Sequence, residues 1–153
     1  MNHYKDESNN LYAYESDGSQ DAFIKEGLVP ISDEDLATLR APTPDQLLQQ
    51  LTQARKSQER QGVTINGIRY AGDPGNRQAL QESIGFMDDA GLTEFESWKD
   101  SDDEFHVNHP LADVFDAYRA IGMRRVALIA AEGEYAAQIT AGTLTDLSEV
   151  VWP

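Results

Sequence analysis

Two histidines beside a run of acids are the first residues in this chain that could bind a metal ion. His106 and His109 follow closely on Asp102, Asp103 and Glu104, and imidazole nitrogens and carboxylate oxygens are common ligands of divalent cations. The alternation of side chains along a strand, however, predicts that His106 and His109 lie on opposite faces. We therefore expect solvent-facing or helix-capping histidines, and no bound metal or other cofactor.

A glycine-rich turn at a predicted helix start offers a second candidate, an anion site. It runs from Gly72 to Arg77 with the sequence GDPGNR. Free backbone N–H groups converge at a helix N-terminus, and an arginine could add further donors. The segment lacks the length and the lysine of a phosphate-binding P-loop. We expect a capped helix without a ligand here.

No sequence pattern identifies a catalytic group. The chain contains no Gly-x-Ser-x-Gly elbow, no His-Glu-x-x-His helix and no Gly-x-Gly-x-x-Gly turn, which are the motifs of common hydrolase, metalloprotease and dinucleotide sites. Acid–base catalysis by two carboxylates needs different environments for the two, and no carboxylate here lies in a recognisably apolar stretch. We expect a protein that is not an enzyme. The alternative is a small hydrolase that uses His106 or His109.

Tyrosines near the N-terminus favour protein binding. Tyr4, Tyr12 and Tyr14 lie in two short alternating segments surrounded by acids, and tyrosine combines a large contact area with a polar tip. Tyr12 and Tyr14 share one face because they are two residues apart. We predict a partner-binding face that contains Tyr4, Tyr12 and Tyr14. The alternative is that this face packs on residues 22–31.

The composition restricts the kinds of partner that this protein can bind. The formal net charge of −15 disfavours nucleic acid and anionic membranes, because those surfaces attract lysine and arginine. Residues 1–42 carry nine acids against three bases, and residues 92–110 carry six against one. Cysteine is absent, and no apolar run approaches the ~20 residues that cross a bilayer. We expect a soluble protein that binds neither nucleic acid nor membrane, and the absence of cysteine suits a reducing cytoplasm as well as other compartments.

The strongest structural signal is the segment 63–80, VTINGIRYAGDPGNRQAL. Asn66 and Gly67 can adopt the positive φ angles of a type I′ turn between two strands rich in β-branched and aromatic residues. Asp73 can then cap a helix that starts at Pro74. Further hairpins are predicted within residues 3–15 and around an exposed acidic turn at residues 100–103, and shorter helices behind Ser32 and Thr43.

A long helix is predicted from Pro110 to about residue 141. Apolar residues in this segment fall on a heptad seam, which resembles a coiled-coil register. Arg125 and Glu132 interrupt the seam at two successive positions that are normally apolar. The seam could pack along the chain's own domain or pair with a second copy to form a homodimer, and the two arrangements can coexist. Its members are Leu111, Val114, Tyr118, Ile121, Leu128, Tyr135 and Ile139.

Together these elements predict an α+β fold. A small N-terminal β-hairpin module at residues 1–42 ends at a proline-rich break, APTP, at residues 41–44. The domain that follows, residues 43–153, contains in order a helix, a β-hairpin, a helix, a short hairpin and the long C-terminal helix. The N-terminal module is the candidate for binding a partner.

The order of these motifs resembles the tail-fibre assembly chaperones of tailed bacteriophages and of the related R-type pyocins. The N-terminal tyrosine hairpin, the proline-rich break and a glutamine-rich helix precede the hairpin at residues 63–70. Asp73, Arg77 and Leu80 follow. An acidic segment around Trp98, the long helix and a closing segment from Leu147 to Trp152 complete the match, which is stronger over residues 43–153.

This resemblance implies a protein made in the bacterial cytoplasm that binds the C-terminal, receptor-binding region of a trimeric tail fibre. It would promote the folding and trimerisation of the fibre without consuming a nucleotide. The alternative from another class is an acidic mimic of DNA that inhibits a nucleic-acid-handling protein of the host.

Overall fold

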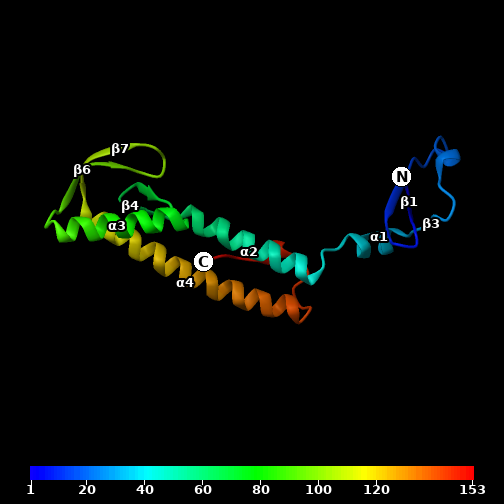
Figure 1. Cartoon of the computed structure of the whole chain (residues 1–153). Coiled ribbons are helices and arrows are strands. Elements are labelled where there is room, and N and C mark those ends of the chain that lie inside the picture. Colours follow the sequence, from blue (N-terminus) through cyan, green and yellow to red (C-terminus); the bar gives the residue numbers. More distant parts are fainter. The chain divides into compact units, whose positions relative to one another are not determined.

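A computed structural model describes all 153 residues and confirms the expected α+β fold. The chain divides into two compact units, Met1–Thr43 and Pro44–Pro153 (Figure 1). None of its helices combines the length and the apolar character needed to cross a bilayer. The break between the units lies in the proline-rich segment at residues 41–44.

The first unit is a three-stranded antiparallel sheet followed by one helix. Its elements are β1 (Asn2–Lys5), β2 (Leu11–Tyr14), the 3-10 turn η1 (Asp21–Phe23), β3 (Val29–Pro30) and α1 (Asp33–Arg40). β1 is the central strand, with β2 on one side and β3 on the other. The hairpin and the helix behind Ser32 are confirmed, and the Ser32 hydroxyl accepts the Asp35 N–H at 3.0 Å. The sequence does not predict β3, because a two-residue strand that ends in proline shows no alternation.

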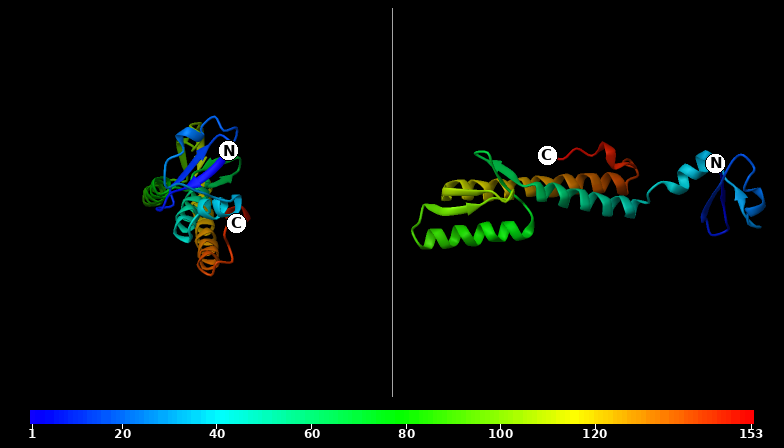
Figure 2. Two further views of the ribbon diagram at one scale, coloured as in Figure 1. Left: turned by 90° about the vertical axis from the view of Figure 1, so that its right-hand side faces the viewer. Right: turned by 90° about the horizontal axis from the view of Figure 1, so that it is seen from above.

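The second unit is built along one long helix. Its elements are α2 (Pro44–Gln61), β4 (Val63–Ile65), β5 (Ile68–Tyr70), α3 (Pro74–Asp89), β6 (Glu94–Lys99), β7 (Phe105–Pro110), α4 (Leu111–Thr140) and the 3-10 turn η2 (Leu147–Glu149). α2 and α3 both pack against α4 (Figures 1 and 2). The hairpins β4–β5 and β6–β7 form separate two-stranded sheets. The predicted long helix is thus confirmed as the spine of this unit.

The segment 63–80 folds as predicted. Asn66 and Gly67 have φ angles of 51° and 83°, as a type I′ turn requires. The Asp73 carboxylate caps α3 by accepting the N–H groups of Gly75 at 3.0 Å and Asn76 at 3.2 Å. These are local signals, and each of them forms in the structure.

Two glycines allow the end of α2 to lie directly against the chain that leaves β5. Gly62 has a φ of 68°, and a Cβ added to it would overlap the carbonyl oxygen of Tyr70. A Cβ on Gly72 would overlap the carbonyl oxygen of Glu59. Any larger residue would therefore push the hairpin away from α2.

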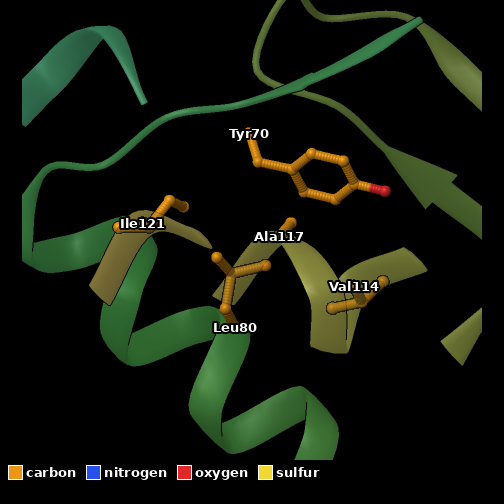
Figure 3. Close-up of a cluster of buried hydrophobic side chains, with 5 residues drawn as sticks. All are labelled: Tyr70, Leu80, Val114, Ala117 and Ile121. Atoms are coloured by element: carbon orange, nitrogen blue, oxygen red, sulfur yellow. The ribbon is translucent and has the colours of Figure 1, made fainter. Parts of the chain in front are cut away.

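Two apolar clusters hold the second unit together. One joins β5, α3 and α4, where five buried side chains converge (Figure 3): Tyr70, Leu80, Val114, Ala117 and Ile121. The other joins α2 to the C-terminal part of α4 and contains Leu47, Leu51, Ile139 and Leu144. Trp152 packs on this second cluster, and its ring meets that of Tyr135 at 6.2 Å. The closing segment of the chain therefore packs against the core.

The predicted heptad seam lies inside the second unit. Val114, Ile121, Leu128 and Ile139 are buried, and Leu111, Tyr118 and Tyr135 are half-buried. Val114, Tyr118 and Ile121 of the seam belong to the cluster with β5 and α3, and Tyr135 and Ile139 belong to the cluster with α2. A homodimer formed through this seam would have to displace those elements.

Candidate functional site

The three N-terminal tyrosines lie on one face of the first sheet. In the β1–β2 register Tyr4 is directly opposite Tyr12, and Asn2 is opposite Tyr14. Opposite residues in an antiparallel pair share a face, as do residues two apart on one strand. The Tyr4 and Tyr14 rings meet edge to face with centroids 5.7 Å apart. All three tyrosines are half-buried, and we call this surface the tyrosine face.

Charged side chains anchor the Tyr12 end of the tyrosine face. The Tyr12 hydroxyl donates to the Asp6 carboxylate at 3.2 Å. Asp6 also organises the β1–β2 turn, and hydrogen bonds, above all from the Asn10 side chain, lower the pKa of Asp6. Lys25 Nζ lies 5.1 Å from the centre of the Tyr12 ring, within cation–π range. Residues 22–31, the alternative packing partner, therefore cover part of Tyr12 through Lys25.

His106 and His109 lie side by side, and the prediction that they occupy opposite faces is wrong. Their ring centroids are 6.0 Å apart. The cause is Asn108, whose φ of 51° interrupts the regular alternation of β7. Val107 and Asn108 are both exposed, and the alternation resumes one position later. His109 is consequently buried at 2% exposure, and the expectation of a solvent-facing side chain is wrong for it as well.

His109 belongs to a buried aromatic group. Its Nε2 lies 2.6 Å from the hydroxyl of Tyr70, which is also 2% exposed. Trp98 stacks on the His109 ring with centroids 5.5 Å apart. Burial lowers the pKa of His109 and raises the pKa of Tyr70 to about 12. Both groups are therefore uncharged at neutral pH, and this histidine packs in the core.

The acidic turn at residues 100–103 is held against β5. Arg69 pairs with Asp102 at 2.7 Å and donates to the Ser101 carbonyl at 2.6 Å. The Ala71 N–H donates to the Ser101 hydroxyl at 2.7 Å. The prediction of an exposed turn holds for Asp102 and fails for Asp100, whose side chain is only 5% exposed.

Asp100, Glu104 and His106 form the group that could best hold a metal ion. Each offers one ligand atom, and these atoms lie within 4.8 Å of one another. Of the residues that the sequence proposed as ligands, this group keeps Glu104 and His106, whereas His109 lies in the core and Asp102 pairs with Arg69. Asp100 already accepts the N–H groups of Asp102 and Glu104 and pairs with His106 at 2.9 Å. These bonds, chiefly the one to His106, lower the pKa of Asp100. They also give the Asp100 carboxylate a structural role, because it holds the turn between β6 and β7 together.

The predicted anion seat at the start of α3 is a helix cap, as expected. Asp73 occupies the N-terminal N–H groups. Arg77 donates to the Gly72 carbonyl at 2.5 Å and lies 3.6 Å from the Glu59 carboxylate. Arg77 is thus directed toward α2.

An ion network between α2, α3 and α4 is the main polar feature that the sequence did not reveal. Glu59, whose side chain is 8% exposed, lies 2.5 Å from Arg55, 3.4 Å from Arg125 and 3.6 Å from Arg77. Arg55 also pairs with Glu132 at 2.6 Å. Arg125 and Glu132, the two charged interruptions of the seam, therefore form the ion pairs between α4 and α2, and Arg124 adds a hydrogen bond to Gln58 at 3.1 Å.

Comparison with known families gives a match over most of the chain. The family described as "Domain of unknown function (DUF4376)" matches residues 42–151. The chain belongs to this family. No curated protein and no solved structure matches the chain. The DUF4376 domain thus contains α2 to α4, both apolar clusters and the ion network, whereas the tyrosine face lies outside it.

The DUF4376 domain also exposes apolar side chains along α4. Phe115, Met123, Val126 and Ile129 are 46%, 71%, 69% and 40% exposed. On the neighbouring α3, Phe86 is 68% exposed. Exposed apolar groups that gather on one element are typical of surfaces that bind other molecules. The domain therefore carries a second candidate surface besides the tyrosine face.

Proposed function

We propose that this protein is a tail-fibre assembly chaperone. It binds the C-terminal, receptor-binding region of a trimeric phage or pyocin tail fibre in the bacterial cytoplasm, and it promotes folding and trimerisation of that fibre without catalysing a reaction. The observation that carries the proposal is the tyrosine face: three half-buried tyrosines on one face of a small acidic unit. The ordered resemblance described for the sequence supplies the identity of the partner.

The physical role follows from the chemistry of the two partners. Long β-rich fibres pass through intermediates with open strand edges and exposed apolar surface, and such intermediates aggregate. Tyrosines can cover part of that surface because each offers a broad ring and a hydroxyl that can form hydrogen bonds. The net charge of −15 on this protein would make complexes of fibre chain and chaperone repel one another and so oppose their aggregation. The complex would therefore stay in solution while three fibre chains assemble.

A binding measurement with matched variants tests this proposal. The probe is the purified C-terminal region of the tail fibre encoded beside the gene for this chain. We expect Tyr14→Ala to weaken binding about tenfold, equivalent to ~1.4 kcal/mol, as for a central aromatic contact. Phe23→Ala is the control, because Phe23 is an aromatic residue of the same unit that is 72% exposed and lies outside the tyrosine face.

Two results would contradict the proposal. One is the absence of binding between the wild-type chain and the fibre region. The other is a pull-down from host cells that recovers a nucleic-acid-handling protein in place of the fibre, which would favour the DNA-mimic alternative. Equal effects of Tyr14→Ala and Phe23→Ala would remove the tyrosine face from the proposal.

A further inference from the structure

A groove between α3 and α4 concentrates positive charge in an acidic protein. Its volume is about 830 Å³, and its lining includes Arg77, Arg119 and Arg125 but no acidic residue. The chain as a whole has 27 acids against 12 bases. We propose that this groove docks an acidic segment of a partner protein, whose carboxylates meet the arginines. This inference goes beyond the fibre proposal, since it concerns a different surface in a different unit.

The arginines of the groove are only partly neutralised within the chain, because Arg77 and Arg125 share the single carboxylate of Glu59. Arg119 is exposed and makes no hydrogen bond or ion pair. Arg125 is 44% exposed and shares Glu59 with Arg77 and Arg55. One carboxylate thus faces three guanidinium groups, of which only Arg55 has a second acidic partner. Additional carboxylates from outside would complete the pairing, and planar guanidinium groups bind carboxylates well.

The spread of charge fits a peptide better than a small ion. Arg119 and Arg125 are six residues apart on α4, which corresponds to a rise of roughly 9 Å along the helix axis. Arg77 reaches the groove from α3. A single phosphate or carboxylate could not contact all three at once, whereas an extended or helical segment with acids at intervals could.

Apolar side chains also line the groove, so its occupant needs apolar groups as well as acids. Tyr118, Met123 and Val126 line it, and Met123 and Val126 are 71% and 69% exposed. An occupant that covered them would gain hydrophobic free energy in proportion to the apolar area removed from water. The occupant that fits is therefore a segment that contains both Asp or Glu and at least one apolar side chain.

Gly122 provides a way to block the groove without disturbing the fold. It lies in the groove lining within α4, and apart from the adjoining backbone of α4 itself, a Cβ added there would meet no atom within 4 Å. Gly122→Leu should also favour the helix, because glycine is a poorer helix former than leucine. Gly133 is the matched control, since it too lies within α4 with open space around its Cβ position but does not line the groove.

The experiment selects short random peptides from a display library on the immobilised full-length chain and then measures the affinity of the enriched peptides. We expect enrichment of Asp and Glu together with apolar residues. Gly122→Leu and Arg119→Gln should each weaken binding about tenfold, which corresponds to ~1.4 kcal/mol. Gly133→Leu and Arg40→Gln, which removes an arginine of the other unit, should leave the affinity unchanged. Circular dichroism verifies that each variant keeps its helices.

Any one of five results would overturn the inference. The selection could enrich no peptides or peptides without acids, or Gly122→Leu could leave binding intact. Sodium phosphate, added at a concentration of negative charge equal to that of the peptide, could displace the peptide completely, which would indicate a small-anion site. Light scattering could show a dimer that Gly122→Leu converts to a monomer, which would make a second copy the occupant. None of these measurements involves the tail fibre, so the outcome is independent of the fibre proposal.

Discussion

Removing the negative charge of Glu59 should destabilise the DUF4376 domain. The variant Glu59→Gln preserves the size of the side chain but leaves Arg55, Arg77 and Arg125 without their shared carboxylate. Breaking a buried ion pair by removing one partner costs about 3–5 kcal/mol, and an exposed pair contributes about 0–1 kcal/mol.

The network lies between these limits. Glu59 is 8% exposed, but its three arginines are 13%, 22% and 44% exposed, so water screens part of the interaction. Arg55 also retains Glu132, and the new amide oxygen can still accept a hydrogen bond from it. We therefore expect the free energy of unfolding to fall by about 2 kcal/mol, which for a chain of this size lowers Tm by roughly 6 °C.

Urea unfolding, monitored by tryptophan fluorescence, measures the stability of the structural unit that contains the ion network. Both tryptophans, Trp98 and Trp152, lie in the unit Pro44–Pro153. Glu134→Gln is the control, because Glu134 is an exposed acid on α4 and its loss changes the net charge equally. If Glu59→Gln and Glu134→Gln agree within about 0.5 kcal/mol, the ion network does not stabilise the domain and the reasoning is refuted.

Two further predictions concern the hairpin and the buried histidine. In the same urea assay, Gly62→Ala should lower the free energy of unfolding by more than about 3 kcal/mol, because its Cβ would overlap the Tyr70 carbonyl oxygen. The control Gly91→Ala, also at positive φ but with open space around it, should lower it by only about 1–2 kcal/mol through backbone strain. Similar losses for the two variants would show that the close approach at Gly62 is unimportant. The pKa of His109 is lowered in the folded protein, so the unfolded chain binds the proton first and the free energy of unfolding should fall as the pH drops below 6.5, the ordinary value. His109→Gln should flatten this dependence between pH 7 and 5, and an unchanged profile would assign it to other groups.

Local signals account for most of the fold that the sequence predicts. The Asn66-Gly67 turn, the Asp73 cap and the Ser32 cap each depend on a few adjacent residues, because backbone φ angles and terminal N–H groups are satisfied within one turn of chain. The long helix is predictable from its length without proline. Its termini at Leu111 and Thr140 agree with the expected range.

The placement of the histidines shows where a regular pattern fails. Strand alternation separates His106 from His109, but one left-handed residue, Asn108, reverses the result. Asparagine is among the few residues that tolerate this conformation, so the composition permits the interruption. Only the packing of His109 on Tyr70 and Trp98 selects it.

The ion network shows a second limit. Along α4, Arg125 and Glu132 look like interruptions of an apolar seam, because their partners on α2, Glu59 and Arg55, are distant in the sequence. Spacing within one helix cannot show which charges another helix will bring. The same holds for the arginine groove, whose residues come from α3 and α4.

Co-expression is the measurement that tests the proposed function most directly. The tail-fibre gene beside the gene for this chain is expressed with and without the chain, and the yield of soluble, trimeric fibre is measured by size-exclusion chromatography with light scattering. The account predicts that soluble trimer forms in quantity only when the chain is present, and that Tyr14→Ala reduces the yield more than Phe23→Ala does. A fibre that is equally soluble and trimeric without the chain would contradict the account.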